Sequence, residues 1–213
     1  EITTADILGS ARYHLATLLG TTPPADPLTP IQDAIVWQGR APRVVTAVGI
    51  GAGLAITGAV MQALLRNPLA DPYLLGISSG ASVGAVAVLV LGISVLLPVA
   101  AFAGAVLALA AALALAGVVS GGRLTPGRTV LAGVAVAQAC SAVTSFIIFT
   151  SVQGDSYREV LGWLMGTLGG TTWRSAVIVW VALAVVGIAL VTSGRTLDAF
   201  AFGDVSAASL GIH

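Results

Sequence analysis

The sequence has very little charge. Only 8% of its 213 residues are charged and 57% are hydrophobic, and the mean hydropathy is +1.00. A soluble domain usually has about 25% charged residues. So few charges cannot cover a water-facing surface, and we therefore expect much of the surface to face lipid. The net charge at pH 7 is +0, so no electrostatic argument favours nucleic acid as a partner.

Side chains that carry chemistry are equally scarce. Cys140 is the single cysteine, which excludes an internal disulfide and a cysteine-rich metal site. His14 belongs to a surface segment and His213 is the last residue, and we expect both to be solvated. No G-x-x-x-x-G-K-S/T motif occurs, so ATP, if it drives this protein, binds to another chain. The sequence therefore predicts no enzyme, no cofactor and no metal site.

Long uncharged runs are what the sequence does have. A helix of about 20 apolar residues crosses a bilayer, and Val44 to Leu65 has that length. The run from Tyr73 to Gly122 is too long for one crossing and predicts two spans with a turn at Gly92 to Pro98. Further spans are predicted at Thr129 to Thr150 and Ser175 to Ser193. These five spans predict an all-α, polytopic transmembrane helix bundle.

Polar segments flank and connect the spans. Glu1 to Gly20 is predicted to form an amphipathic surface helix, and Ile31 to Gly39 a second short amphipathic segment after a proline-rich loop. Ser151 to Thr172 is predicted to be a polar connector, and the tail from Gly194 to His213 to hold one short helix.

The five-span topology places three tryptophans on one side. Trp37, Trp163 and Trp173 fall on the side of Arg40, as residues of an interfacial belt do. About five arginines lie on that side and four on the other, so arginine counting leaves the orientation open.

The polar residues within the spans are uncharged, and small residues recur among them. No span carries an acidic or basic residue in its middle, which argues against a proton- or sodium-coupled carrier. The polar residues from Gln138 to Ser145 either hydrogen-bond between helices or line a weakly polar pore, and both interpretations stay open. Small residues recur at four-residue spacing and predict close helix packing within one bundle rather than a dimer seam; they are Gly49 and Gly53, Gly80 and Gly84, and Gly104, Ala108 and Ala112.

Several motifs occur in a fixed order along the chain. They are Arg40-Ala41-Pro42-Arg43, Gly58-Ala59-Val60-Met61-Gln62, Asn67-Pro68-Leu69-Ala70-Asp71-Pro72, Leu75-Gly76-Ile77-Ser78-Ser79-Gly80-Ala81, Trp163-Leu164-Met165-Gly166 and the segment from Gly203 to Gly211. In this order they resemble the FecCD-type permease family, the membrane subunits of bacterial ABC importers for iron-siderophores, haem and cobalamin.

The resemblance implies a topology and partners. Family members have about ten spans, sit in the bacterial cytoplasmic (inner) membrane, and act as homodimers or heterodimers of permeases. A substrate-binding protein caps them outside and two ABC ATPase subunits bind inside. Residues 1–213 would form one incomplete permease domain, with 1–39 extracytoplasmic, 44–193 containing the spans, and 203–213 forming the cytoplasmic coupling helix.

The resemblance also implies residue roles. Arg40 and Arg43 match outer arginines that pair with acidic residues of the binding protein, with anchoring to lipid headgroups as the alternative. Asn67 and Leu69 match a cytoplasmic gate in a cobalamin importer of the family, with a plain interhelical turn as the alternative. A second gate would fall near Ser151, Val152, Gln153 and Gly154. The ATPase-coupling segment would contain Gly203, Asp204, Ala207, Leu210 and Gly211, with Asp204 capping its helix.

The expected function follows from this resemblance. The chain would belong to a permease subunit that translocates an iron-siderophore-type chelate by ATP-driven alternating access, without catalysis of its own. Two alternatives remain. One is import of haem or cobalamin by the same mechanism, and the other is a non-transporting membrane scaffold or sensor.

Overall fold

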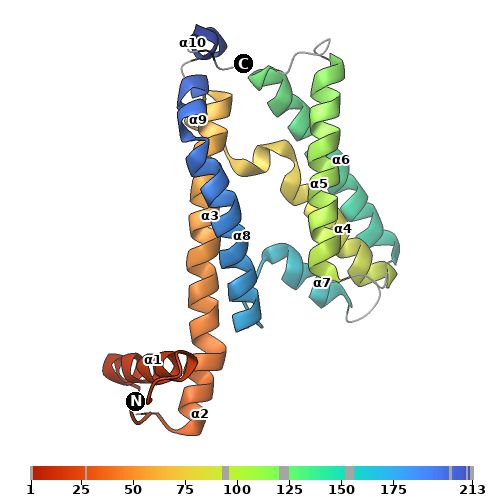
Figure 1. Cartoon of the computed structure of the whole chain (residues 1–213). Helices are drawn as coiled ribbons and strands as arrows, with labels where there is room; N and C mark the ends of the chain where they lie inside the picture. Colours follow the sequence, from red (N-terminus) through yellow and green to blue (C-terminus); the bar gives the residue numbers. More distant parts are fainter. Residues whose placement is uncertain are drawn as a thin grey trace. The chain divides into compact units, whose positions relative to one another are not determined.

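In a computed structural model of the chain, helices and the turns between them make up the described residues, which are 2–26, 28–92, 96–119, 125–151, 156–201, 203–209 and 211 (Figure 1). Four helices there are long and apolar enough to cross a membrane: α3 (Ala41–Leu65), α5 (Leu97–Val119), α6 (Pro126–Ser151) and α8 (Trp173–Thr192). A shorter apolar helix, α4 (Ile77–Leu91), lies between α3 and α5 in the sequence. The predicted all-α membrane bundle is confirmed, with four to five spans.

The chain divides into two compact units. Unit 1 contains residues 1–55 and 168–191, and unit 2 contains residues 56–167 and 192–213. Unit 1 therefore holds α1 (Thr4–Leu18), α2 (Pro30–Asp33), the π-helix η1 (Ala34–Arg40), the first part of α3 and most of α8. Unit 2 holds the end of α3 and the remaining helices.

Helix α1 begins where a capping box predicts a helix start. The Thr3 hydroxyl accepts the Asp6 N–H, and the Asp6 carboxylate accepts the Thr3 N–H at 2.9 Å. The Thr3 hydroxyl also donates to this carboxylate at 2.7 Å, and the two hydrogen bonds that the carboxylate accepts, from the Thr3 backbone and hydroxyl, lower the pKa of Asp6 below its ordinary value. The cap satisfies backbone donors that a helix start otherwise leaves unpaired, and the helix predicted within residues 1–20 is confirmed.

The segment before the first span is continuous with it, which the sequence did not predict. Helix runs without a break from Pro30 to Leu65, where a separate short segment ending at Gly39 was expected. A proline inside a helix cannot donate a backbone hydrogen bond and crowds the carbonyl four residues earlier. The π-type bond from the Ala41 N–H to the Val36 carbonyl shifts the ladder just before Pro42. The helix therefore passes through this proline instead of starting at it.

Helices α3 and α8 pack together in unit 1. The Trp180 indole N–H donates to the Val45 carbonyl at 3.1 Å. A Cβ added at Gly49 would lie 2.8 Å from Val179 Cγ1, so the missing side chain lets the two helices approach. At one end of this pair the Trp173 indole N–H donates to the Trp37 carbonyl at 2.9 Å. Trp37 and Trp173 thus lie at the same end of unit 1, as the predicted topology requires.

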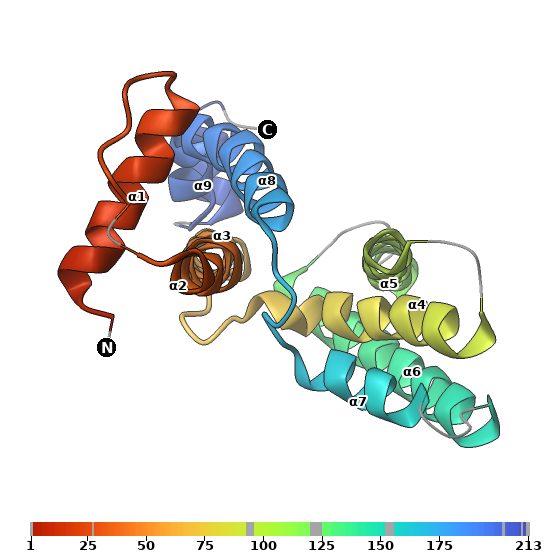
Figure 2. The ribbon, with the colours of Figure 1, turned by 90° about the horizontal axis from the view of Figure 1, so that it is seen from below.

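Helix α4 is the centre of unit 2. It contacts α5, α6 and α7 (Ser156–Met165), and Figure 2 shows it between α5 on one side and α6 with α7 on the other. Gly80 and Gly84 of α4 lie directly against the backbone of Gly104 and Ala100 of α5. The four-residue spacing of small residues therefore packs helices within one bundle, as predicted.

The tail contains two helices rather than the single one expected. They are α9 (Gly194–Ala201) and α10 (Asp204–Ser209). The break falls at Gly203, whose φ of 109° is a conformation that residues with a Cβ rarely adopt. One glycine between two apolar stretches was the available signal for this break.

Candidate functional site

The polar turn from Arg66 to Asp71, here called the 66–71 turn, ends helix α3 in a fixed way. Arg66 has φ of 49°, the one non-glycine residue with positive φ in the described part of the chain. This left-handed residue turns the chain so that the Asn67 N–H reaches the Gln62 carbonyl at 3.2 Å. The Gln62 side-chain amide in turn donates to the Pro68 carbonyl at 3.0 Å. The turn is therefore tied back onto the last helical residues.

Asn67 shapes the turn, and Leu69 projects from it. The Asn67 side-chain oxygen accepts the Leu69 N–H at 2.9 Å, and its backbone carbonyl accepts the Ala70 N–H at 3.0 Å. An asparagine that bonds the backbone two residues on is a common turn former. Leu69 is 86% exposed while the neighbouring Ala70 is 5% exposed. The turn therefore presents one leucine side chain at the position where a gate is predicted.

The residues after the turn are held against α6. The Asp71 carboxylate accepts the Tyr73 N–H at 2.7 Å and begins the 3-10 helix η2 (Pro72–Leu75). A Cβ added at Gly133 of α6 would lie 2.8 Å from Leu75 Cα, and one at Gly76 would lie 3.1 Å from the Gly133 carbonyl oxygen. Backbone therefore meets backbone here, which anchors the base of the 66–71 turn.

The predicted coupling segment is only partly described. Gly203 donates its N–H to the Phe200 carbonyl at 3.0 Å, and its own carbonyl accepts the Ala207 N–H at 2.9 Å. Ala207 is completely buried, and Gly211 has a positive φ of 76°. Asp204 is the first residue of α10, but the capping role predicted for its side chain, and all of Leu210, lie outside what the structure describes.

Arg40 and Arg43 lie on consecutive turns of the long helix. Arg40 is the last residue of η1 and Arg43 lies in the first turn of α3. Both are exposed, and within the described part of the chain neither forms an ion pair. Residues three apart are neighbours on a helix surface, so both guanidinium groups are available at one place.

The second predicted gate cannot be placed. Ser151 is the last residue of α6, and its hydroxyl lies 3.2 Å from that of Thr150. Val152, Gln153 and Gly154 lie outside the described residues.

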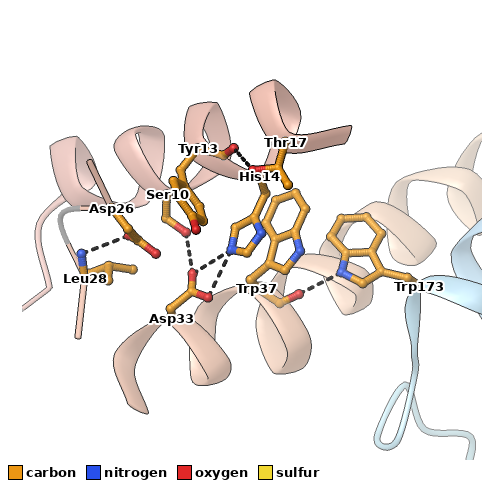
Figure 3. A network of polar contacts seen from close by, with 9 residues as sticks. All are labelled: Ser10, Tyr13, His14, Thr17, Asp26, Leu28, Asp33, Trp37 and Trp173. Carbon is orange, nitrogen blue, oxygen red and sulfur yellow. Dashed lines mark hydrogen bonds and ion pairs between the residues drawn. The ribbon is translucent and has the colours of Figure 1, made fainter. Parts of the chain in front are cut away.

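A polar network around His14 was missed by sequence reasoning (Figure 3). The His14 Nε2 lies 2.9 and 3.0 Å from the two Asp33 carboxylate oxygens. The Ser10 hydroxyl donates to the same carboxylate at 2.7 Å, and the His14 ring stacks on Trp37 with centroids 4.2 Å apart. The expectation that His14 is solvated was wrong, because its side chain is only 20% exposed. Ser10 and His14 are four residues apart on one helix face, which was the available signal.

Among the described residues, this network also contains a group of side chains that could hold a metal ion. His14, Asp26 and Asp33 each offer one ligand atom, and these atoms lie within 4.8 Å of one another. The Asp33 carboxylate already accepts hydrogen bonds from Ser10 and contacts His14, so the network is closed without an ion. Its evident role is to fasten α1 to α2 and η1.

Comparison with known proteins covers nearly the whole chain. The model of the FecCD transport family matches residues 5–213. The vitamin B12 import system permease protein BtuC of Escherichia coli O1:K1 / APEC is 40% identical over 195 residues, which are 89% of this chain and 57% of that relative. BtuC of E. coli strain K12 / DH10B matches to the same extent.

One solved structure is also similar. It is described as an inward-facing metal-chelate type ABC transporter, and it matches with a TM-score of 0.74 and 26% identity over 98% of this chain and 66% of that chain. The chain thus spans less than two thirds of the length of these relatives. Because the family model matches almost every residue, the chain belongs to the FecCD transport family.

Proposed function

We propose that this chain is part of the permease subunit of a bacterial ABC importer. The observation that carries the proposal is the family match over residues 5–213, together with 40% identity to vitamin B12 import permeases. The long helices support it, because large apolar side chains such as Val177, Val181 and Val185 of α8 are more than half exposed and suit contact with lipid.

Cobalamin is the substrate that we propose first. The BtuC relatives are vitamin B12 import permeases, which favours the cobalamin alternative over the iron-siderophore interpretation. An iron chelate remains the second candidate, because the similar solved structure is described as a metal-chelate type transporter. Both are bulky metal complexes, so the proposed substrate class is a large metal chelate.

The proposed mechanism uses the residues described above in three places. Arg40 and Arg43 dock the acidic surface of an extracytoplasmic binding protein, where exposed charge steers association. Closure of two partner ATPases on ATP moves the segment from Gly203 to Gly211. That movement opens and closes the 66–71 turn, in which Asn67 fixes the backbone and Leu69 blocks the passage. A second permease subunit completes the pathway.

The test is uptake by the complete system. The full-length permease, its ATPase and its binding protein are reconstituted in proteoliposomes, and labelled cobalamin is offered with ATP. We expect ATP-dependent accumulation that excess unlabelled cobalamin abolishes and ferric siderophore leaves largely intact. If only the ferric siderophore reduced the uptake, iron chelates would be the substrate class instead. If neither compound accumulates, the transport proposal is contradicted and the scaffold alternative is favoured.

A further inference from the structure

The Arg66 side chain joins the 66–71 turn to the tail helices. The Arg66 Nε–H donates to the Phe200 carbonyl oxygen at 3.2 Å, across 134 positions of sequence. Phe200 is the second-last residue of α9, and its carbonyl also accepts the Gly203 N–H at 3.0 Å. The last carbonyls of a helix lack partners within the helix and carry its negative dipole end, so a guanidinium is a favourable partner there.

The same guanidinium lies beside the break between α9 and α10. A Cβ added at Gly203 would lie 3.6 Å from Arg66 Nη1. Gly203 is the residue whose φ of 109° separates the two helices. Arg66 therefore contacts the end of α9 and lies beside Gly203, where α9 and α10 are separated.

The backbone of Arg66 indicates that its side chain is needed at this position. The end of a helix that requires positive φ is usually occupied by glycine, because a Cβ is strained there. Arg66 occupies it with φ of 49°. Glycine would relieve the strain but would lose the contact with Phe200. A strained residue is grounds for a hypothesis of function at that site.

Space around the contact permits movement. A cavity of about 280 Å³ lies beside it, lined by Met61 and Leu64 of α3, Arg66, Leu113 of α5, Pro126 of α6 and Phe200. Most of the residues that line it are apolar. Arg66 is followed directly by Asn67, so its side-chain contact links the end of α9 to the first residues of the hydrogen-bonded turn.

We propose that Arg66 is the positioning residue that transmits movement of α9 and α10 to the 66–71 turn. This inference rests on the proposed function. It assigns to Arg66 a role separate from binding the ATPase and separate from blocking the passage. Loss of the contact should therefore uncouple ATP hydrolysis from transport while the complex stays assembled.

The experiment compares variants of the full-length transporter with ATPase in proteoliposomes. R66Q removes the charge, and R66K keeps a cation that can still donate to a carbonyl. R128Q is the matched control, because Arg128 is also an exposed arginine and donates to a backbone carbonyl, that of Val119, at 3.3 Å. Each variant is measured for ATPase co-purification, ATP hydrolysis and substrate uptake.

We expect R66Q to retain the ATPase and to hydrolyse ATP within about twofold of the unaltered complex, while uptake per ATP falls at least tenfold. R66K should recover part of the uptake, and R128Q should behave like the unaltered protein. Unchanged uptake per ATP in R66Q overturns the inference, and so does loss of folding or of ATPase binding in both Arg66 variants, which would make the role structural. Absence of uptake by the unaltered complex would instead contradict the proposed function.

Discussion

At the scale of single residues, Asn67 and Leu69 divide the work of the turn. The Asn67 side chain is bonded to the backbone, whereas the Leu69 side chain is almost fully exposed. An exposed leucine on a polar turn adds little to folding, and the proposed function gives this one a role. That role is closure of a passage.

Replacing Leu69 tests that division. L69A should change the free energy of unfolding by less than about 0.5 kcal/mol, because the side chain is exposed. It should raise passive leak of substrate from loaded proteoliposomes several-fold, because the blocking group is shortened. L107A is the matched control, since Leu107 is 70% exposed on α5, away from the turn. Equal leak in both variants would mean that the turn only connects two helices and does not act as a gate.

Reversing the charge at Arg40 and Arg43 tests docking. The R40E/R43E variant should slow binding-protein association on the order of tenfold at low salt, because like charges then face each other. The effect should shrink at high salt, where exposed charges are screened. Surface plasmon resonance measures the rates, and R174E is the control, since Arg174 is exposed near Trp173 but outside the motif. An unchanged association rate would leave only the headgroup-anchoring role.

The sequence identified residues of the 66–71 turn but not the residues that contact this turn. Motif order pointed to Arg40, Arg43, Asn67 and Leu69. It did not point to the Arg66–Phe200 contact, which joins residues 134 positions apart and depends on how α9 packs. The spacing of Ser10 and His14 indicated one helix face but not its partner Asp33, because the proline-rich loop sets which face of α1 meets α2.

At the scale of elements, small residues decide how closely helices approach. G80A should cost about 1–3 kcal/mol, because the new Cβ would overlap the Gly104 carbonyl and Ala108 Cβ on α5. G117A is the control in α5, where an added Cβ meets nothing within 4 Å; alanine there should stabilise the helix by roughly 0.5–1 kcal/mol. Unfolding in detergent measures both. A G80A protein as stable as G117A would contradict the packing described for α4 and α5.

The hydrogen bonds of Asp33 are expected to hold α1 in place, and replacing Asp33 tests this. D33N should weaken the hydrogen bonds from Ser10 and His14, and hydrogen bonds to a charged group contribute about 1.5–3 kcal/mol each. Hydrogen exchange in α1 should therefore accelerate. D26N should have a smaller effect, because Asp26 accepts only the Leu28 N–H in this network. Equal protection of α1 in D33N and the unaltered protein would mean that other contacts hold the helix.

Element boundaries followed from sequence where local rules dominate. The uncharged runs located α3, α5, α6 and α8 because lipid requires long apolar helices. The π-helix before Pro42 and the break at Gly203 were missed, since each depends on how one residue fits a particular backbone rather than on hydrophobic pattern.

At the scale of the whole molecule, long helices with no charged residue in their middles suit a protein that moves within a membrane. The proposed path of force runs from the ATPase to α10 and α9, through Arg66, to Leu69. Each contact along it within the chain lies in unit 2. Such a path requires that the 66–71 turn faces the cytoplasm and responds to nucleotide.

The most direct test is labelling of a single cysteine at Leu69 by a membrane-impermeant maleimide. The L69C protein carries C140A, so that Cys140, the one cysteine of these 213 residues, does not react, and any cysteines in the rest of the complex are replaced as well. We predict labelling of the full-length complex in inside-out vesicles but not in right-side-out vesicles, at a rate that changes when the ATPase is trapped with a non-hydrolysable nucleotide. Labelling from the outer face, or a rate indifferent to nucleotide, would contradict the account.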